Sequence, residues 1–165
     1  MTHTATRIIG FDAAHRVLRH ESKCGTLHGH RYKAEITCQA RDSRIGVCHG
    51  IDSQTDDLDS VGRVIDFGVI KEIIGTWIDE NLDHTTIVGN SDINLLDFCT
   101  DEAECDGKRA PYVMYGEPTA ENIAALLFET GNNLLESHGS TVRVVHVKLW
   151  ETPNCYAEYE EIFDD

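Results

Sequence analysis

Two histidines stand two positions apart at the start of a stretch that alternates between apolar and polar residues up to Ala40. In His28-Gly29-His30 both imidazoles share the parity of the apolar positions, so on a β-strand they project from one inward face. Burying two imidazoles is costly unless they bind a partner, and His15 is the nearest candidate for a third ligand. Three histidines with a fourth position open to water or substrate are typical of catalytic zinc. The spacing alone also allows two ordinary strand histidines bonded to the backbone.

Cys24 lies four residues before His28 and directly after Lys23. A neighbouring ammonium group and a nearby metal ion would both favour the thiolate form of its side chain. A thiolate at this position could act as a general base or as a nucleophile. The alternatives are a further zinc ligand and an inert thiol.

A carboxylate and an imidazole are adjacent at Asp83 and His84, directly after a predicted helix. The carboxylate can orient the ring and raise its basicity, which a proton relay requires. The alternative is an ordinary histidine at a helix end, where its charge complements the helix dipole.

Glu151 lies at the end of the last long β-branched stretch and shares the parity of Val145, Val147 and Leu149. It therefore continues an apolar face, and a carboxylate buried on that face needs a partner. The cationic or N–H-rich edge of a ligand would serve, and so would a buried arginine.

Hydrophobic periodicity predicts the elements that position these residues. Strand patterns cover residues 4–11, 30–41, 62–67, 141–150 and 155–163. Helical spacing predicts one helix over 67–81 and a second from Pro118 to about Gly139, with a helix-weakening Gly131 in its middle.

Two polar insertions, near 42–61 and 90–116, separate these elements and are expected to be loops. The strand at 62–67 could form a hairpin across the first of them. Adjacent strands joined by short turns favour an antiparallel sheet with helices on one face, an α+β domain. We expect a single domain over residues 1–165.

The composition excludes several classes of protein. The chain has 165 residues, 41% of them hydrophobic, which suffices for one domain with its own core. No apolar run approaches the ~20 residues of a membrane helix and no secretory signal is visible, so we expect a cytoplasmic protein with reduced cysteines. The formal net charge of −15 argues against binding to nucleic acid, which needs a basic face.

The charge is spread unevenly along the chain. Acidic residues gather within 52–59 and 92–106, where we expect solvated surface. The segment 13–33 is net positive and could supply a local field for a small anion. Its basic residues are Arg16, Arg19, Lys23, Arg31 and Lys33. Strand parity puts Arg31 and Lys33 on the face opposite the histidine pair.

Together these motifs resemble the 6-pyruvoyl-tetrahydropterin synthase / 6-carboxy-tetrahydropterin synthase family. The matching segments are 11–15 (FDAAH), 23–30 (KCGTLHGH), 64–67 (VIDF), 82–84 (LDH), 118–122 (PTAEN) and 151–152 (ET). They occur in the family's order and span most of the chain. The three-residue gap between Cys24 and His28 looks like that of bacterial 6-carboxy-tetrahydropterin synthases, which act in queuosine and 7-deazaguanine (preQ0) biosynthesis.

The resemblance implies the T-fold, a four-stranded antiparallel sheet with two helices on one face. It implies assembly of trimers into a homohexameric barrel. It also implies a Zn²⁺ ion on His15, His28 and His30, and Cys24 as the general base or proton-transfer thiol.

Further site residues follow from the same resemblance. Asp83 and His84 would form a relay that is often supplied by a neighbouring subunit. Glu151 would anchor the 2-amino-pyrimidinone edge of a pterin, and Thr119 and Ala120 would line its pocket.

The implied reaction is that of a zinc-dependent carbon–oxygen lyase. It converts 7,8-dihydroneopterin triphosphate to 6-carboxy-5,6,7,8-tetrahydropterin and releases triphosphate and acetaldehyde. The two insertions leave a changed substrate open. The alternatives are a pyruvoyl-forming synthase, a side-chain-cleaving variant and a zinc- and pterin-binding module without turnover. A generic zinc hydrolase is disfavoured because no glutamate stands beside the histidines as in H-E-x-x-H.

Overall fold

A six-stranded mixed sheet runs through the part of the chain that the computed structural model describes, residues 3–41 and 58–160. The strands are β1 (Ala5–His15), β2 (His28–Ala40), β3 (Thr85–Gly89), β4 (Tyr112–Met114), β5 (Val142–Thr152) and β6 (Cys155–Glu160). Their order across the sheet is β4-β3-β1-β2-β5-β6. Residues 161–163, the end of the last predicted strand, lie outside the described residues.

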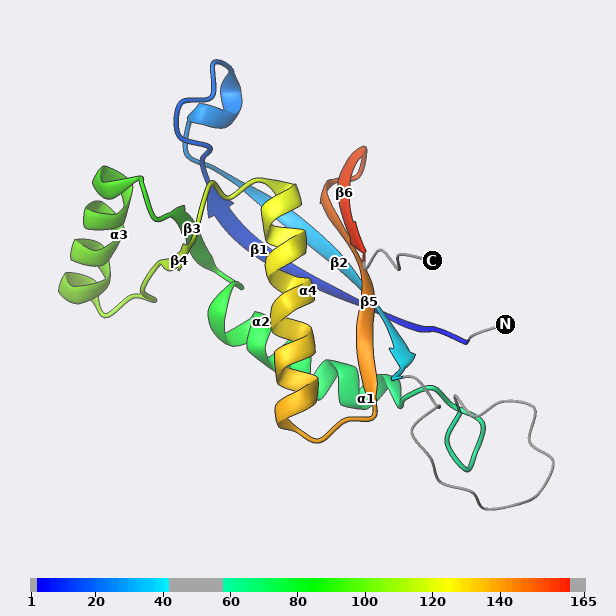
Figure 1. Ribbon diagram of the computed structural model, residues 1–165. Coiled ribbons are helices and arrows are strands. Elements are labelled where there is room, and N and C mark those ends of the chain that lie inside the picture. The colour runs from blue at the N-terminus through cyan, green and yellow to red at the C-terminus, as the bar shows by residue number, and fades with distance from the viewer. Residues whose placement is uncertain (1–2, 42–57, 161–165) are drawn as a thin grey trace.

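The helices gather mainly on one face of this sheet (Figure 1). They are α1 (Phe67–Ile70), a π-helical turn (Lys71–Gly75), α2 (Thr76–Asn81), α3 (Ile93–Asp106) and α4 (Ala120–Ser137). The segment α1–α2 is continuous and matches the predicted helix over 67–81. It packs with α4 over the central strands, whereas α3 lies beside β3 and β4 at the sheet edge. None of the helices in the described residues is long and apolar enough to cross a membrane.

The predicted four-stranded antiparallel sheet is correct only for β1, β2, β5 and β6. The strands β3 and β4 extend it, and both pairings on that side are parallel. The connection through α1 and α2 returns the chain to the start of β3, which lies beside the end of β1 and runs in the same direction. Helix α3 is the crossover that joins the parallel strands β3 and β4.

The prediction of a strand over 62–67 is wrong, and with it the predicted hairpin. Asp59 closes a turn by accepting the backbone N–H groups of Val61 and Arg63 at 3.0 and 2.9 Å. Asp66 then caps α1 by accepting the N–H of Gly68 at 2.7 Å. The carboxylates of Asp59 and Asp66 therefore accept the backbone N–H groups near both ends of this segment, which favours a turn and a helix cap over pairing with another strand. Residues 42–57 of this insertion lie outside the described residues.

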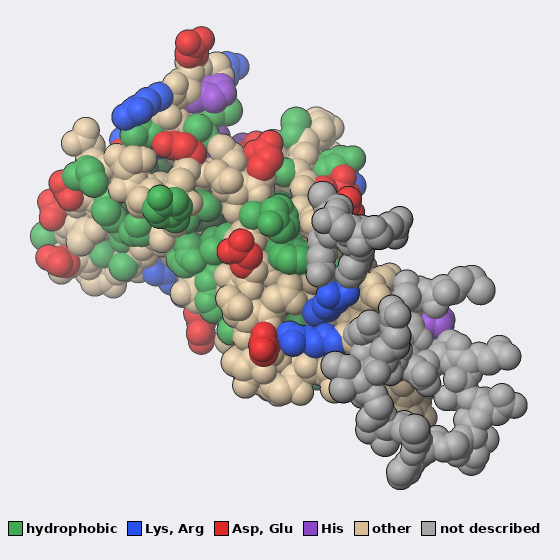
Figure 2. All heavy atoms as spheres, viewed as in Figure 1, with side chains coloured by type: hydrophobic (Ala, Val, Ile, Leu, Met, Phe, Trp, Pro, Cys, Tyr) green, Lys and Arg blue, Asp and Glu red, His purple; other side chains and the backbone are tan. Residues whose placement is uncertain are grey.

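The expected loop at 90–116 is also wrong, because it contains α3 and β4. Asp92 caps α3 at its start, and Gly107 ends it in the left-handed conformation at φ 63°. The acidic side chains of the helix are exposed, as expected, and gather over α3 in Figure 2. Asp92 is the exception, since it is 4% exposed.

Helix α4 continues through Gly131 without a break. A Cβ atom at this position would lie 3.0 Å from Val144 Cγ2 and 3.2 Å from Ile74 Cδ1. The glycine therefore allows α4 to approach β5 and the π-helical turn closely, and tertiary packing offsets its poor helix propensity.

A β-bulge in β5 changes the predicted face of one residue. Thr37 pairs with His146 and Cys38 pairs with Val144, so Val145 is an extra residue without a partner in the register. Val144 and Val147 are both fully buried although their parity differs, whereas Val145 is only half-buried. The expectation that Val145 shares the core face is therefore wrong, and Glu151 keeps its parity with Val147 and Leu149.

Candidate active site

Three histidines converge at the paired ends of β1 and β2. His15 lies opposite His28, and Ala13 lies opposite His30, in an antiparallel register. One side-chain nitrogen from each ring lies within 4.8 Å of the others. Strand alternation places all three rings on the same side, so the predicted inward orientation of the H-x-H pair is confirmed.

Backbone carbonyls orient two of the rings. His15 Nδ1 donates to the carbonyl of Pro118, and His28 Nδ1 donates to the carbonyl of Thr26, each at 2.7 Å. A neutral imidazole that donates through Nδ1 presents an unprotonated Nε2. The alternative that these are ordinary strand histidines bonded to the backbone therefore explains the Nδ1 atoms of His15 and His28. It leaves their Nε2 atoms unexplained.

The remaining nitrogens fit a metal ion. His15 Nε2 and His30 Nε2 are buried without a hydrogen-bond partner in the described structure. Burial lowers the pKa of both His15 and His30, which favours the neutral form that metal binding requires. Three imidazoles, two of them oriented by backbone carbonyls, are a donor set suited to Zn²⁺.

Glu151 comes from β5 to the same place. Its Oε1 atom lies 3.5 Å from His15 Nε2 and 3.9 Å from His30 Nε2, and its side chain is 24% exposed. The carboxylate therefore lies where the core face of β5 reaches the histidine cluster and still contacts solvent. It is available to an incoming ligand.

A cavity of about 230 Å³ collects most of the predicted site residues. It is lined by His15, Cys24, Thr119, Ala120 and Glu151, which come from four separate segments. Five further lining residues were not predicted from the sequence: Val17, His20, Glu121, Cys155 and Tyr156. The tight turn between β5 and β6 places Cys155 and Tyr156 next to Glu151, and only the pairing of those strands could have indicated this.

Cys24 lies on a short 3-10 turn, Lys23–Gly25, and is half-buried. Its carbonyl accepts the N–H of Val17 at 2.8 Å, which folds the connection between β1 and β2 back on itself. A Cβ atom at Gly25 would lie 2.7 Å from the carbonyl oxygen of His20, so this close fold requires glycine. Cys38 differs from Cys24, because burial in the core raises its pKa to about 12 and leaves it an inert thiol.

Asp83 and His84 form a hydrogen-bonded pair. His84 Nδ1 donates to Asp83 Oδ2 at 2.7 Å, and the backbone N–H of Asp12 donates to Asp83 Oδ1 at 2.7 Å. Partial burial alone would raise the pKa of Asp83, but these hydrogen bonds hold it below its ordinary value. The carboxylate is therefore ionised and orients the ring, as a relay requires.

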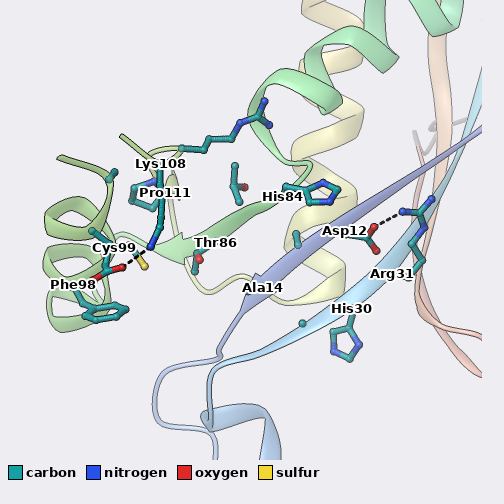
Figure 3. Close-up of a pocket in the computed structure, with 16 residues that line it drawn as sticks. Asp12, Ala14, His30, Arg31, His84, Thr86, Phe98, Cys99, Lys108 and Pro111 are labelled. Atoms are coloured by element: carbon teal, nitrogen blue, oxygen red, sulfur yellow. Dashed lines mark hydrogen bonds and ion pairs between the residues drawn. The ribbon is translucent and has the colours of Figure 1, made fainter. Parts of the chain in front are cut away.

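His84 of this pair lines a different cavity, of about 840 Å³, between α3 and the strands β1 and β2 (Figure 3). His30 of the histidine cluster lines the same cavity, whereas Cys24 and Glu151 do not. His84 lines it with Phe98, Cys99 and Lys108, and its side chain is 74% exposed. Within one chain, the structure does not bring His84 into the cavity of Cys24.

Three of the basic residues in the 13–33 segment form ion pairs with carboxylates of the same chain. Arg16 donates to both carboxylate oxygens of Asp92, at 2.6 and 2.7 Å. Arg31 pairs with Asp12 (Figure 3), and Lys33 pairs with Glu35 at 3.0 Å. Arg31 and Lys33 alternate with the buried residues of β2, as the predicted parity requires. Arg19 and Lys23 are exposed on the connection that carries Cys24.

Comparison with known proteins places the chain among pterin enzymes. The sequence profile of the 6-pyruvoyl tetrahydropterin synthase family matches residues 4–162. A 6-carboxy-5,6,7,8-tetrahydropterin synthase of Rickettsia bellii is 39% identical over 154 residues, which cover 93% of this chain and 96% of that one. The Haemophilus influenzae protein of the same name is 29% identical over 154 residues, with coverage of 92% and 94%.

Solved structures share the fold. An uncharacterized protein from Wolinella succinogenes superposes with a TM-score of 0.71 at 23% identity, covering 98% of this chain and 99% of that one. The 6-pyruvoyl tetrahydropterin synthase of Caenorhabditis elegans superposes with a TM-score of 0.61 at 20% identity, with coverage of 98% and 97%. The α+β architecture is therefore common to these proteins.

Proposed function

The chain belongs to the 6-pyruvoyl tetrahydropterin synthase family, and within it we propose a zinc-dependent 6-carboxy-5,6,7,8-tetrahydropterin synthase. The proposed substrate is 7,8-dihydroneopterin triphosphate, and the products are 6-carboxy-5,6,7,8-tetrahydropterin, triphosphate and acetaldehyde. The name and near-complete coverage of the Rickettsia bellii relative support this choice over pyruvoyl formation. The pathway we propose for the product is queuosine and 7-deazaguanine (preQ0) synthesis.

One observation carries the proposal. His15, Cys24 and Glu151 line a single small cavity, and His15 belongs to a cluster in which two Nε2 atoms, those of His15 and His30, are buried without a hydrogen-bond partner in the described residues. A metal-binding cluster, a thiol and a carboxylate in one cavity meet the needs of a reaction that binds a pterin and moves protons.

The three histidines would hold Zn²⁺, which as a Lewis acid would acidify the C–H and O–H bonds of a side chain bound to it. The carbonyls of Pro118 and Thr26 keep two of the rings in the tautomer that metal binding needs. The chain itself therefore supplies a preorganised donor set.

Cys24 would be the general base, because its thiol enters the cavity from a connection beside the histidine cluster. Asp83 and His84 would complete the proton relay. Since His84 faces a separate cavity, we propose that this pair serves the site of a neighbouring copy in a homohexamer built from two trimers. The side-chain exposure of His84, 74%, leaves its ring accessible to such a neighbour.

Glu151 would bind the 2-amino-pyrimidinone edge of the pterin, whose N–H groups match a partly exposed carboxylate. Thr119 and Ala120 would form the opposite wall of the pocket. Both stand at the start of α4, where Thr119 caps the helix by accepting the N–H of Asn122 at 3.3 Å. A helix terminus is a rigid support for a binding wall.

The test is incubation of the zinc-loaded protein with 7,8-dihydroneopterin triphosphate, followed by product identification by mass spectrometry. We expect 6-carboxy-5,6,7,8-tetrahydropterin and acetaldehyde in equal amounts. Pyruvoyl-tetrahydropterin as the only product would instead identify a pyruvoyl-forming synthase. A protein that binds the pterin but leaves the triphosphate intact would be a binding module.

A further inference from the structure

We infer that Glu117 is a positioning residue for Cys24. Its carboxylate holds the connection that carries this thiol, residues 16–27, against the segment that also orients His15. This inference rests on the proposed function for its kinetic consequence, whereas its effect on the thiol can be measured without turnover.

The contact is direct and short. Glu117 Oε2 accepts the backbone N–H of Leu18 at 2.6 Å, across 99 residues of sequence. The residue before Leu18 is Val17, whose N–H donates to the carbonyl of Cys24 at 2.8 Å. The Glu117 carboxylate therefore binds the backbone at Leu18, one residue after Val17, whose N–H contacts the carbonyl of Cys24.

Glu117 is itself fixed in place. Its backbone carbonyl accepts the N–H of Thr119 at 2.8 Å and the side-chain amide of Asn122 at 2.9 Å. The next residue, Pro118, provides the carbonyl that accepts His15 Nδ1. One rigid segment before α4 thus orients a predicted metal ligand through its backbone and the thiol connection through a side chain.

The connection needs an anchor of this kind because little of it is buried. Residues 19–23 are exposed, and Arg19 adopts a left-handed conformation at φ 69°. Its backbone hydrogen bonds are mostly local: the N–H of Gly25 donates to the carbonyl of Ser22, and the N–H of Thr26 donates to the carbonyl of Lys23. A segment with few buried contacts opens easily, and a charge-assisted hydrogen bond at its base limits that motion.

The experiment compares Glu117→Ala, Glu117→Asp and Glu117→Gln in the zinc-loaded protein, with Glu129→Ala on the exposed face of α4 as control. Alkylation of Cys24 by iodoacetamide is followed by mass spectrometry of the tryptic peptide 24–31, which contains no other cysteine. Alanine removes the acceptor of the Leu18 N–H, whereas glutamine keeps an oxygen that can accept it. The aspartate side chain is shorter by one methylene group, so its carboxylate lies further from Leu18.

We expect Glu117→Ala to raise the alkylation rate of Cys24 at least fivefold and to lower kcat at least tenfold, with KM changed less than threefold. Glu117→Asp should show the same changes, more weakly. Glu117→Gln, which keeps an acceptor oxygen but loses its charge, should change both values less than Glu117→Ala does. Glu129→Ala should stay within twofold of the unchanged protein.

Equal alkylation rates in Glu117→Ala, Glu117→Asp and the unchanged protein would overturn the inference. A defect as large in Glu117→Gln as in Glu117→Ala would also overturn it, because the acceptor would then not matter. If the unchanged protein makes no product but Glu117→Ala still accelerates alkylation, the positioning role stands and the proposed reaction fails.

Discussion

His15 and His28 face each other across the β1–β2 pair, and a backbone carbonyl accepts Nδ1 of each at 2.7 Å. The carbonyl for His28 lies only two residues away, whereas that for His15 comes from Pro118, 103 residues further along the chain. The orientations of the two rings are therefore fixed by different segments: that of His28 by the connection before β2, and that of His15 by the segment before α4. Both present Nε2 to the same place.

Replacing a histidine of this cluster should abolish metal binding. We expect His28→Ala to reduce zinc from about one ion per chain to a small fraction of that, because two imidazoles hold Zn²⁺ poorly. Elemental analysis of the purified, dialysed protein measures this. His138→Ala, at the exposed end of α4, is the control and should keep its zinc. Full occupancy in His28→Ala would remove this residue from the ligand set.

Cys24→Ala separates the roles of base and ligand. We expect zinc content and melting temperature to stay unchanged while kcat falls by about a hundredfold or more, the usual cost of losing a general base. Cys105→Ala, an exposed cysteine on α3, should behave as the unchanged protein. Should Cys24→Ala lose its zinc together with its activity, the thiol would be a metal ligand instead.

Glu151→Gln keeps the size of the side chain but removes its charge. Hydrogen bonds to charged groups contribute about 1.5–3 kcal/mol, so we expect KM to rise by about tenfold to a hundredfold. Steady-state kinetics with 7,8-dihydroneopterin triphosphate measure this, with Glu160→Gln at the end of β6 as control. Unchanged values of both kcat and KM would show that Glu151 does not anchor the pterin.

The pair of Arg16 and Asp92 should stabilise the protein in a pH-dependent way. Hydrogen bonds from the Arg16 guanidinium hold the pKa of Asp92 below its ordinary value of 3.8, despite burial. Because the pKa is lower in the folded state, the stabilisation is complete above that ordinary value and is lost as pH falls through the folded pKa.

We therefore expect Asp92→Asn, which can still cap α3, to lower the free energy of unfolding by about 2 kcal/mol at pH 7. The difference should narrow below pH 3.8. Urea unfolding at several pH values measures it, and Asp97→Asn on the exposed side of α3 is the control. A difference independent of pH would rule out the ion pair as its cause.

Gly131→Ala tests whether packing decides the residue inside α4. Alanine improves helix propensity by about 1 kcal/mol, but its Cβ would crowd Val144 and Ile74, and overpacking costs about 1–3 kcal/mol. We expect a net loss of about 1 kcal/mol in the free energy of unfolding. Gly107→Asn, at the open end of α3, should be nearly neutral because no atom lies within 4 Å of its Cβ position and asparagine tolerates its positive φ. A more stable Gly131→Ala would contradict this.

Much of the central fold could be predicted because it depends on local patterns. Alternation located the strands that became β1, β2 and β5, and helical spacing located α1–α2 and α4. Short elements were missed or wrong: β3 has five residues and β4 has three, too few for a period to show. The strand expected at 62–67 failed because Asp59 and Asp66 satisfy nearby N–H groups with their side chains.

The sequence by itself determined which side chains share a face wherever a strand is regular, because alternation is a property of the extended backbone. The exception is Val145, whose face is changed by the β-bulge in β5. The sequence therefore indicated the grouping of His28 with His30 and the direction of Glu151. Only the tertiary structure decided that His15 meets Pro118, that Glu117 reaches the Cys24 connection, and that His84 faces a separate cavity. These relationships join segments about 70 to 100 residues apart, so they depend on how the sheet and helices pack.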